Sequence, residues 1–138
     1  MSKKNKTAVI TGSNRGLGLK LLETLSSNEY DIIACSRSKS LSFSKKIEEI
    51  SEKNNNKIFN LNFDLLNKED TEKTLTEFLN EYENNVDLLI NNAGILKNSL
   101  MLMTPSKEVE EIFRVNVYSV NLISQIVAKK MIKNKSGN

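Results

Sequence analysis

Three glycines in one short run are the residues whose spacing points most clearly to chemistry. Gly12, Gly16 and Gly18 lie in the segment Thr11-Gly12-Ser13-Asn14-Arg15-Gly16-Leu17-Gly18, which follows an apolar run and opens an amphipathic one. In such a loop one glycine permits a tight turn, the next lets backbone approach a pyrophosphate, and the last allows a helix to pack closely on a strand. Free N–H groups at the helix N-terminus also favour phosphate. The run predicts a phosphate-binding loop; the alternative is an ordinary strand-to-helix turn.

The elements that must position this loop follow from the apolar pattern. The predicted strands cover residues 7–11, 31–35, 57–63 and 86–90. Helices are predicted from about Gly16, over about 42–53, after Asn67 as N-cap, and from Thr104-Pro105 to about Lys133. This alternation predicts an α/β fold with a doubly wound parallel sheet of strand order 3-2-1-4 and about four helices, in one domain over residues 1–138. The outer edge of the fourth strand is then unpaired.

The third and fourth helices have apolar faces that predict their buried sides. In the third helix this face consists of Leu75, Phe78, Leu79 and Tyr82. In the fourth it consists of Val109, Ile112, Phe113, Val120, Ile123 and Val127, with Val115, Leu122 and Ile126 outside it. Asn116 lies on the predicted face of the fourth helix, and a polar side chain on a buried face needs hydrogen-bond partners. It is either a functional residue or a buried Asn satisfied by nearby backbone.

Composition excludes several classes of function. The chain has 138 residues and a net charge of +3, with 20 basic and 17 acidic residues interspersed, which argues against a nucleic-acid or membrane surface. With one cysteine and no histidine it offers no internal disulfide, no zinc cluster and no Ser-His triad, so no metal site is expected. Cys35 is expected in the core. The segment Met1-Ser2-Lys3-Lys4-Asn5-Lys6 is not a signal-peptide core, and a cytoplasmic protein is expected.

Two motifs together carry a family resemblance. The spacing T-G-x-x-x-G-x-G from Thr11 to Gly18, and Asn91-Asn92-Ala93-Gly94 after the fourth predicted strand, resemble the fingerprints of the short-chain dehydrogenase/reductase family. The second motif taken alone is a turn after a strand. The resemblance covers nearly the whole chain and implies a Rossmann-type fold that holds a nicotinamide dinucleotide. The stretch Ile95-Leu96-Lys97-Asn98-Ser99-Leu100-Met101 is similar to the 3-ketoacyl-(acyl carrier protein) reductase branch.

The resemblance also implies which residues contact the cofactor. Asp64, just past the third strand, would accept a hydrogen bond from the adenine amino group, with the backbone of Leu65 beside it; the alternative is an exposed strand-end Asp. The motif after the fourth strand would lie against the adenosine ribose. The predicted cofactor-binding residues are Gly12, Ser13, Asn14, Arg15, Gly16, Leu17, Gly18, Ser36, Arg37, Asp64, Leu65, Asn92, Ala93 and Gly94.

The end of the second strand indicates which dinucleotide is bound. An acidic residue there pairs with the ribose hydroxyls of NAD and repels a 2′-phosphate. This chain has Ser36 and Arg37 instead, and Arg15 in the glycine loop can approach the same phosphate. A guanidinium binds phosphate through two parallel charge-assisted hydrogen bonds. We therefore expect NADP (NADPH) over NAD; the alternative is two surface arginines with no shared ligand.

The family's chemistry is hydride transfer, with a Tyr-x-x-x-Lys pair, a serine, and an asparagine on the fourth helix. Asn116 matches that asparagine, which in the family orders a water that relays protons to the lysine. The tyrosines are Tyr30, Tyr82 and Tyr118, and none has a lysine four residues later. Without that pair the acid/base step lacks its donor, so full activity from residues 1–138 alone is not expected.

Three hypotheses remain from the sequence. The first is an NADP-dependent oxidoreductase that acts on a small carbonyl or alcohol substrate and is represented by its cofactor-binding part. The second is a module that holds NADP without catalysis, and the third is an inactive fragment with an open sheet edge. Because an open apolar edge and the side of the fourth helix invite association, a homo-oligomer is expected.

Overall fold

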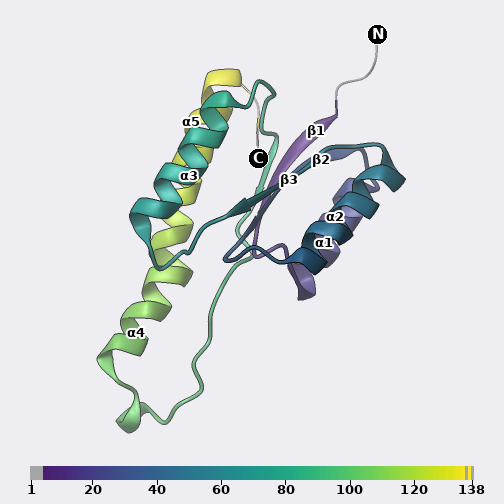
Figure 1. The fold of residues 1–138 in the computed structure, drawn as a ribbon. Helices are drawn as coiled ribbons and strands as arrows, with labels where there is room; N and C mark the ends of the chain where they lie inside the picture. The colour runs from purple at the N-terminus through teal and green to yellow at the C-terminus, as the bar shows by residue number, and fades with distance from the viewer. Residues whose placement is uncertain (1–4, 136, 138) are drawn as a thin grey trace.

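The sheet has the predicted topology. A computed structural model describes residues 5–135 and 137, in which four strands all pair in parallel in the order β3-β2-β1-β4 (Figure 1). The strands are β1 (Lys6–Thr11), β2 (Tyr30–Ser36), β3 (Ile58–Asn62) and β4 (Leu88–Ile90). The central pair is fully buried from Ala8 to Ile10 and from Ile32 to Ala34, as expected for strands covered on both faces. The Rossmann-type α/β prediction is confirmed.

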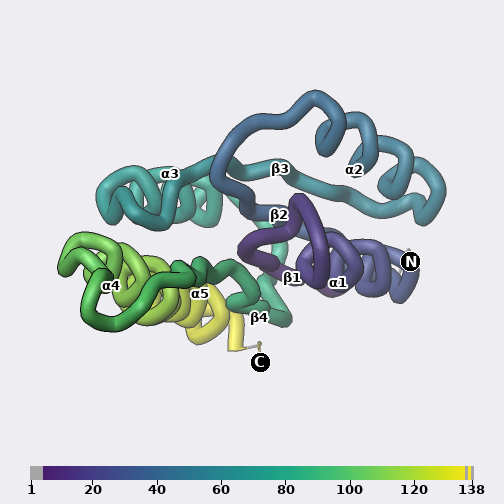
Figure 2. Tube along the Cα trace, turned by 90° about the horizontal axis from the view of Figure 1, so that it is seen from below, coloured from purple at the N-terminus to yellow at the C-terminus, as the bar shows by residue number. Residues whose placement is uncertain are grey.

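Helices cover both faces of the sheet. On one face lie α1 (Gly16–Ser26) and α2 (Leu41–Asn54), and on the other lie α3 (Lys68–Glu81) and α5 (Ser119–Asn134) (Figures 1 and 2). Two apolar clusters result. The first, under α1 and α2, consists of Ala8, Ile10, Leu22, Ile32, Ala34, Phe43 and Ile47. The second, under α3 and α5, includes Val9, Ile33, Cys35, Leu75, Leu79, Ile123 and Val127. The alternation of side chains along β1 and β2 divides the core in this way.

Local caps fix where two of the helices begin. The Asn67 side chain accepts a hydrogen bond from the backbone N–H of Asp70 at 3.0 Å, which confirms the predicted N-cap of α3. Ser40 caps α2 in the same way through the N–H of Phe43. Both caps satisfy backbone donors that a helix N-terminus leaves without intrahelical partners. They orient the two helices that follow the carboxyl ends of β2 and β3.

The prediction for the fourth helix is wrong in its first residue, in its continuity and in its buried face. It begins one residue later than expected, because Pro105 is the N-cap of α4 (Ser106–Phe113), and a 3₁₀ turn, η1 (Met101–Met103), precedes it. A π-helical turn, η2 (Arg114–Tyr118), separates α4 from α5. A π turn contains one residue more than an α turn, so the side chains of α4 and α5 no longer follow one continuous face. Val115, predicted off the apolar face, is therefore buried.

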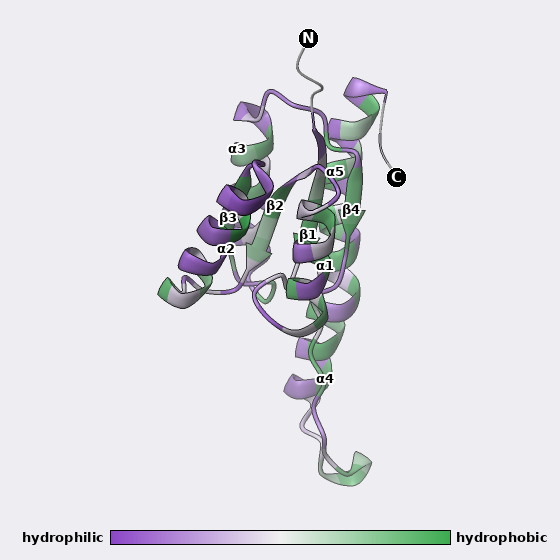
Figure 3. Ribbon diagram, turned by 90° about the vertical axis from the view of Figure 1, so that its right-hand side faces the viewer, coloured by the Kyte–Doolittle hydropathy of each residue, from purple (hydrophilic) through white to green (hydrophobic). Residues whose placement is uncertain are grey.

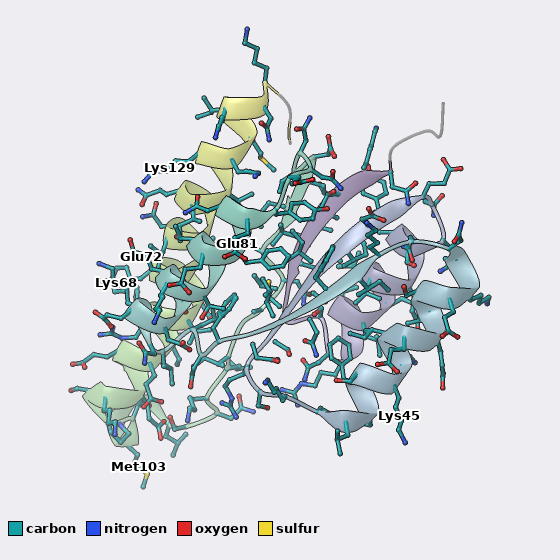
Figure 4. The ribbon with its side chains drawn as sticks, turned by 45° about the horizontal axis from the view of Figure 1, so that its top comes forward. Lys45, Lys68, Glu72, Glu81, Met103 and Lys129 are labelled. Atoms are coloured by element: carbon teal, nitrogen blue, oxygen red, sulfur yellow. The ribbon has the colours of Figure 1, made fainter. Side chains whose placement is uncertain are left out.

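The π turn also leaves the first part of the predicted face exposed. Val109 and Phe113 are 41% and 51% exposed, although the apolar stripe placed them with the buried residues of α5. Residues 95–113 extend beyond the rest of the fold, with the apolar η1 at the tip (Figures 1 and 3). Met103 points away from the body there (Figure 4). We call residues 95–113 the arm.

Two sequence predictions concern residues that the structure does not describe. The expected absence of a signal-peptide core in residues 1–6 rests on Met1 to Lys4, and the predicted turn after Lys133 includes Ser136 and Asn138; these lie outside the described residues. Within residues 5–135 and 137, no helix has the length and apolar content required to cross a bilayer. Over the same residues, no three potential metal-binding side chains come together.

Candidate functional site

The carboxyl ends of the four strands open into one cavity of about 600 Å³. In doubly wound sheets ligands bind at this edge, where the strand order reverses between β1 and β4. The cavity brings together every predicted cofactor residue except Ser13: Gly12, Asn14, Arg15, Gly16, Leu17, Gly18, Ser36, Arg37, Asp64, Leu65, Asn92, Ala93 and Gly94. Four sequence segments far apart in the chain therefore form one site.

Ser13 lies beneath the loop and not in the cavity lining. It is fully buried, its hydroxyl donates to the backbone oxygen of Cys35 at 3.1 Å, and its N–H donates to the same oxygen at 3.2 Å. These two bonds join the loop to the end of β2. The structure therefore gives Ser13 an anchoring contact, where the sequence suggested a direct cofactor contact.

Thr11 and Asn92 join the glycine loop to the end of β4. The Thr11 hydroxyl accepts from the N–H groups of Asn92 and Ala93 at 3.1 and 3.0 Å. In return, the Asn92 amide donates to the backbone oxygens of Thr11 and Gly12 at 3.0 and 3.1 Å. The two motifs are thus joined by hydrogen bonds in both directions, and the Asn92 amide nitrogen donates to the backbone of the loop. The role of Thr11 was not predicted from the sequence, although a hydroxyl directly before Gly12 was the available signal.

Gly12 and Gly18 are required by close approach. Gly12 has φ +66°, and a Cβ on it would lie 3.0 Å from the Ala93 Cα. A Cβ on Gly18 would lie 2.0 Å from the backbone oxygen of Gly12 and 2.6 Å from the Asn92 amide nitrogen. Any side chain at Gly18 would push α1 away from the loop. The expectation that Gly18 allows close helix–strand packing agrees with this geometry.

The start of α1 has the donors that a diphosphate needs. Arg15 is the N-cap residue and makes no side-chain capping bond, so the first N–H groups of α1 face the cavity without a side-chain acceptor. Apart from the adjoining residues and the backbone of α1, no atom of the described residues lies within 4 Å of where a Cβ on Gly16 would be. This open space beside free N–H groups fits a dinucleotide pyrophosphate, with the positive end of the helix dipole directed toward it.

Ser36, Arg37 and Arg15 lie at the β2 end of the cavity. Ser36 is buried at the last position of β2, whereas both arginines are exposed at the rim. Among the described residues, neither guanidinium is paired with a carboxylate. A cavity wall with two unpaired guanidinium groups and a hydroxyl is suited to a phosphate group.

Asp64 lines the cavity just past β3, with part of its hydrogen-bonding capacity already used. Its carboxylate Oδ1 accepts from the N–H of Leu66 at 3.0 Å, and its backbone oxygen accepts from the Thr71 hydroxyl, also at 3.0 Å. These contacts fix the turn between β3 and α3. The second carboxylate oxygen accepts no hydrogen bond from a described residue, which leaves it available to a donor in the cavity.

Asn116 is exposed, contrary to the buried position predicted for it, and lies in the π turn. Its Oδ1 accepts from the N–H of Ile95 at 2.9 Å, and its Nδ2 donates to the oxygen of Ile95 at 2.8 Å. Both polar atoms of the amide are thus paired with the backbone that follows Gly94. The alternative of an Asn satisfied by nearby backbone describes these contacts, and they hold the β4 end of the cavity wall.

Several lining residues had no signal in the sequence. Lys97 and Glu111 face the cavity from the arm and form an ion pair of 3.8 Å, and Val115 reaches the wall through the π turn. Only the tertiary fold brings the arm to this edge. Cys35 also lines the cavity and is 1% exposed, as expected for core, and burial raises the pKa of its thiol to about 12. It is therefore an unreactive thiol.

Comparison with known proteins agrees with this site. The family model for short chain dehydrogenases matches residues 6–138. The chain belongs to the short chain dehydrogenase family. Its glycine loop, its Asn-Asn-Ala-Gly motif and the cavity between them are therefore those of a family of oxidoreductases.

The relatives are about twice as long as this chain. The 3-oxoacyl-[acyl-carrier-protein] reductase FabG of Buchnera aphidicola is 35% identical over 99% of this chain, and the match covers 54% of that protein. The FabG of Aquifex aeolicus is 32% identical, with 52% of its length covered. The chain thus spans about half the length of the relatives that it matches.

Solved structures agree in fold and differ in cofactor. The 3-oxoacyl-[acyl-carrier protein] reductase of Brucella melitensis in complex with NAD has a TM-score of 0.81 and 25% identity, over 95% of this chain and 51% of that one. A short-chain dehydrogenase of Sphingobium yanoikuyae in complex with NADPH has a TM-score of 0.83 and 20% identity, over 96% and 50%. Both nicotinamide dinucleotides thus occur on this fold.

Proposed function

We propose that this chain is the cofactor-binding part of an NADP-dependent oxidoreductase of the short-chain dehydrogenase/reductase type. The observation that carries the proposal is the β2 end of the cavity, where Ser36, Arg37 and Arg15 form a phosphate-suited wall. No carboxylate occupies the position after β2 that would repel a 2′-phosphate. The glycine loop binds the pyrophosphate, Asp64 and Leu65 face the adenine, and Asn92 to Gly94 lie beside the ribose.

The reaction class is reduction of a small carbonyl compound or oxidation of the alcohol. NADPH supplies the hydride when it is bound; this chain's residues bind and orient it. Asn116 acts in the reaction by holding the backbone of Ile95, and so fixes the cavity wall beside the reacting end of the cofactor. No Tyr-x-x-x-Lys occurs in residues 1–138, so the acid/base step is not assigned to any residue of this chain.

Calorimetric titration with NADPH and NADH tests the proposal. We expect tighter binding of NADPH, by roughly ten- to a hundredfold, the worth of a charge-assisted phosphate contact. Arg37→Asp should remove that preference, because a carboxylate there repels the 2′-phosphate and accepts from ribose hydroxyls. Lys39→Asp is the matched control, since it makes the same charge change two residues later on an exposed residue that does not line the cavity. Equal wild-type affinities, or an equal effect of the control, would contradict the proposal.

We propose further that the chain is cytoplasmic and associates with itself. Among the described residues β4 pairs with β1 alone, so its second edge presents unpaired backbone groups. The arm adds exposed apolar side chains at Leu96, Leu100, Met101, Leu102 and Met103. Surfaces of this kind support association, whereas Val115, on the side of the fourth helix from which association was also expected, is buried.

A further inference from the structure

Ser36 has a partner that lies behind the cavity. Parallel pairing of β2 and β3 sets Ser36 opposite Asn62, at the carboxyl end of both strands. Side chains of paired residues lie on the same face of a sheet, so the hydroxyl and the amide are neighbours. The Asn62 Nδ2 donates to the Ser36 Oγ at 2.8 Å. Ser36 lines the cavity, whereas Asn62 is half-buried and does not.

This contact determines what Ser36 offers to a ligand. A serine hydroxyl has one O–H donor and two acceptor lone pairs. Because Asn62 donates to Ser36, one lone pair is used and the hydroxyl hydrogen must point elsewhere. Its only acceptor among the described residues is the Ser38 backbone oxygen, at a long 3.5 Å. The O–H is therefore available as a donor at the cavity wall.

We propose that Asn62 is a positioning residue for cofactor choice: it holds Ser36 as a hydrogen-bond donor to the 2′-phosphate of NADPH. The inference rests on the proposed function. A phosphate dianion only accepts hydrogen bonds, so a hydroxyl held as donor is matched to it. The 2′-hydroxyl of NADH both donates and accepts, so it gains less from a Ser36 whose acceptor capacity is partly used. Asn62 thus favours NADPH without touching it.

Two substitutions separate this role from support of the strand. Asn62→Ala removes the amide donor, and NADPH affinity should fall roughly three- to tenfold. Asn62→Asp keeps the shape but turns the partner into an acceptor, so the Ser36 hydroxyl donates to the carboxylate and is lost to the phosphate. NADPH affinity should then fall roughly ten- to a hundredfold. NADH affinity should change less than about twofold in both variants, since its ribose hydroxyl does not depend on that donor.

A double-mutant cycle shows whether Asn62 acts through Ser36. In a Ser36→Ala background, Asn62→Ala should change NADPH affinity less than about twofold, because the group that it positions is gone. Asn60→Ala is the matched control: Asn60 is two residues earlier on the same face of β3, and its one contact with Asn62 is long, at 3.5 Å. It should leave the NADPH to NADH ratio unchanged.

The outcomes distinguish the two proposals. An equal loss of NADPH and NADH affinity in the Asn62 variants, or a loss that persists without the Ser36 hydroxyl, overturns the role of Asn62 and leaves the proposed function standing. Wild-type chain that binds NADH as tightly as NADPH overturns both. Circular dichroism of each variant identifies any that fails to fold. If Asn62→Ala does not fold, the ratio of NADPH to NADH affinity in Asn62→Asp, which keeps the side-chain volume, tests the role of Asn62.

Discussion

The glycine loop and the arm face the same cavity, but they are held in different ways. The loop, residues 11–18, is fixed by the bonds of Ser13 to the Cys35 backbone oxygen of β2 and by the reciprocal bonds of Thr11 and Asn92. The arm, residues 95–113, is held near the cavity by the two hydrogen bonds between Asn116 and Ile95, and the long ion pair between Lys97 and Glu111 joins its two ends to each other. Beyond these contacts it extends into solvent, with Met101 and Leu102 93% and 99% exposed.

The difference shows that residues 1–138 by themselves fix the cofactor side of the cavity more firmly than the side formed by the arm. Cofactor binding needs backbone atoms at fixed positions, and the loop has them because buried hydrogen bonds determine its course. The arm lines the cavity with Ile95, Lys97 and Glu111, and its tip carries exposed apolar side chains, which are typical of a surface that awaits a partner. Three comparisons of variants, from the largest expected effect to the smallest, test whether the loop is rigid and the arm tolerant.

Gly18→Ala should cause the largest effect. The new Cβ would overlap the Gly12 backbone oxygen at 2.0 Å, which neither backbone can avoid without moving α1. We expect a loss of about 3 kcal/mol in the free energy of unfolding, the upper end of the range for overpacking. Denaturant unfolding measures it. Gly94→Ala is the control, because its Cβ would meet only the Asn116 side chain, at 3.3 Å, and should cost about 1 kcal/mol. Equal losses of stability in the two variants would show that the loop is no more rigid than the backbone at Gly94, where the arm begins.

Thr11→Val and Thr104→Val compare the same change in the two regions. In the loop, the substitution leaves the N–H of Ala93 without its acceptor, at an expected cost of about 1–3 kcal/mol. In the arm, Thr104 donates to the Leu100 oxygen at 3.0 Å in an exposed position, where water replaces the lost partner. That variant should stay within about 0.5 kcal/mol of wild type. Thermal unfolding of both variants measures the two losses of stability. A larger loss in Thr104→Val than in Thr11→Val would contradict the prediction that the loop is the more rigid region.

The same division separates what the sequence predicted from what it did not. The order of the strands followed from apolar runs joined by right-handed crossovers, and Asn67 was found as a cap because local side-chain chemistry defines caps. The loop motif and the Asn-Asn-Ala-Gly motif indicated the cavity because their spacing is local. Asn62 carried no such signal, since its contact with Ser36 depends on the register of two strands.

The π turn shows a different limit. The apolar spacing from Val109 to Val127 is compatible with one continuous α-helix, and nothing local in Arg114 to Tyr118 marks a wider turn. The turn places Asn116 against the Ile95 backbone and turns Val115 inward, which are tertiary contacts. π turns occur frequently at functional sites, and this one lies at the cavity wall. Its position follows from the fold and not from helix periodicity.

The smallest effect on stability, and the clearest on association, is expected at the tip of the arm. Met101→Ser with Leu102→Ser replaces two side chains that contact almost nothing, so the free energy of unfolding should change by less than about 0.5 kcal/mol. If the arm is a surface for self-association, the wild-type chain is a dimer or larger at micromolar concentration, and the variant has a lower average mass by light scattering.

Leu41→Ser provides the control for that experiment. Leu41 is 85% exposed at the start of α2, on the other face of the sheet and far along the chain from the arm. It should leave the mass distribution unchanged, because a single exposed apolar residue is no interface. A monodisperse wild-type monomer would show that the arm tip is tolerated in water and that association needs another surface. A mass unchanged in the arm variant, with an oligomeric wild type, would assign the contact to the open edge of β4, whose backbone groups no side-chain substitution removes.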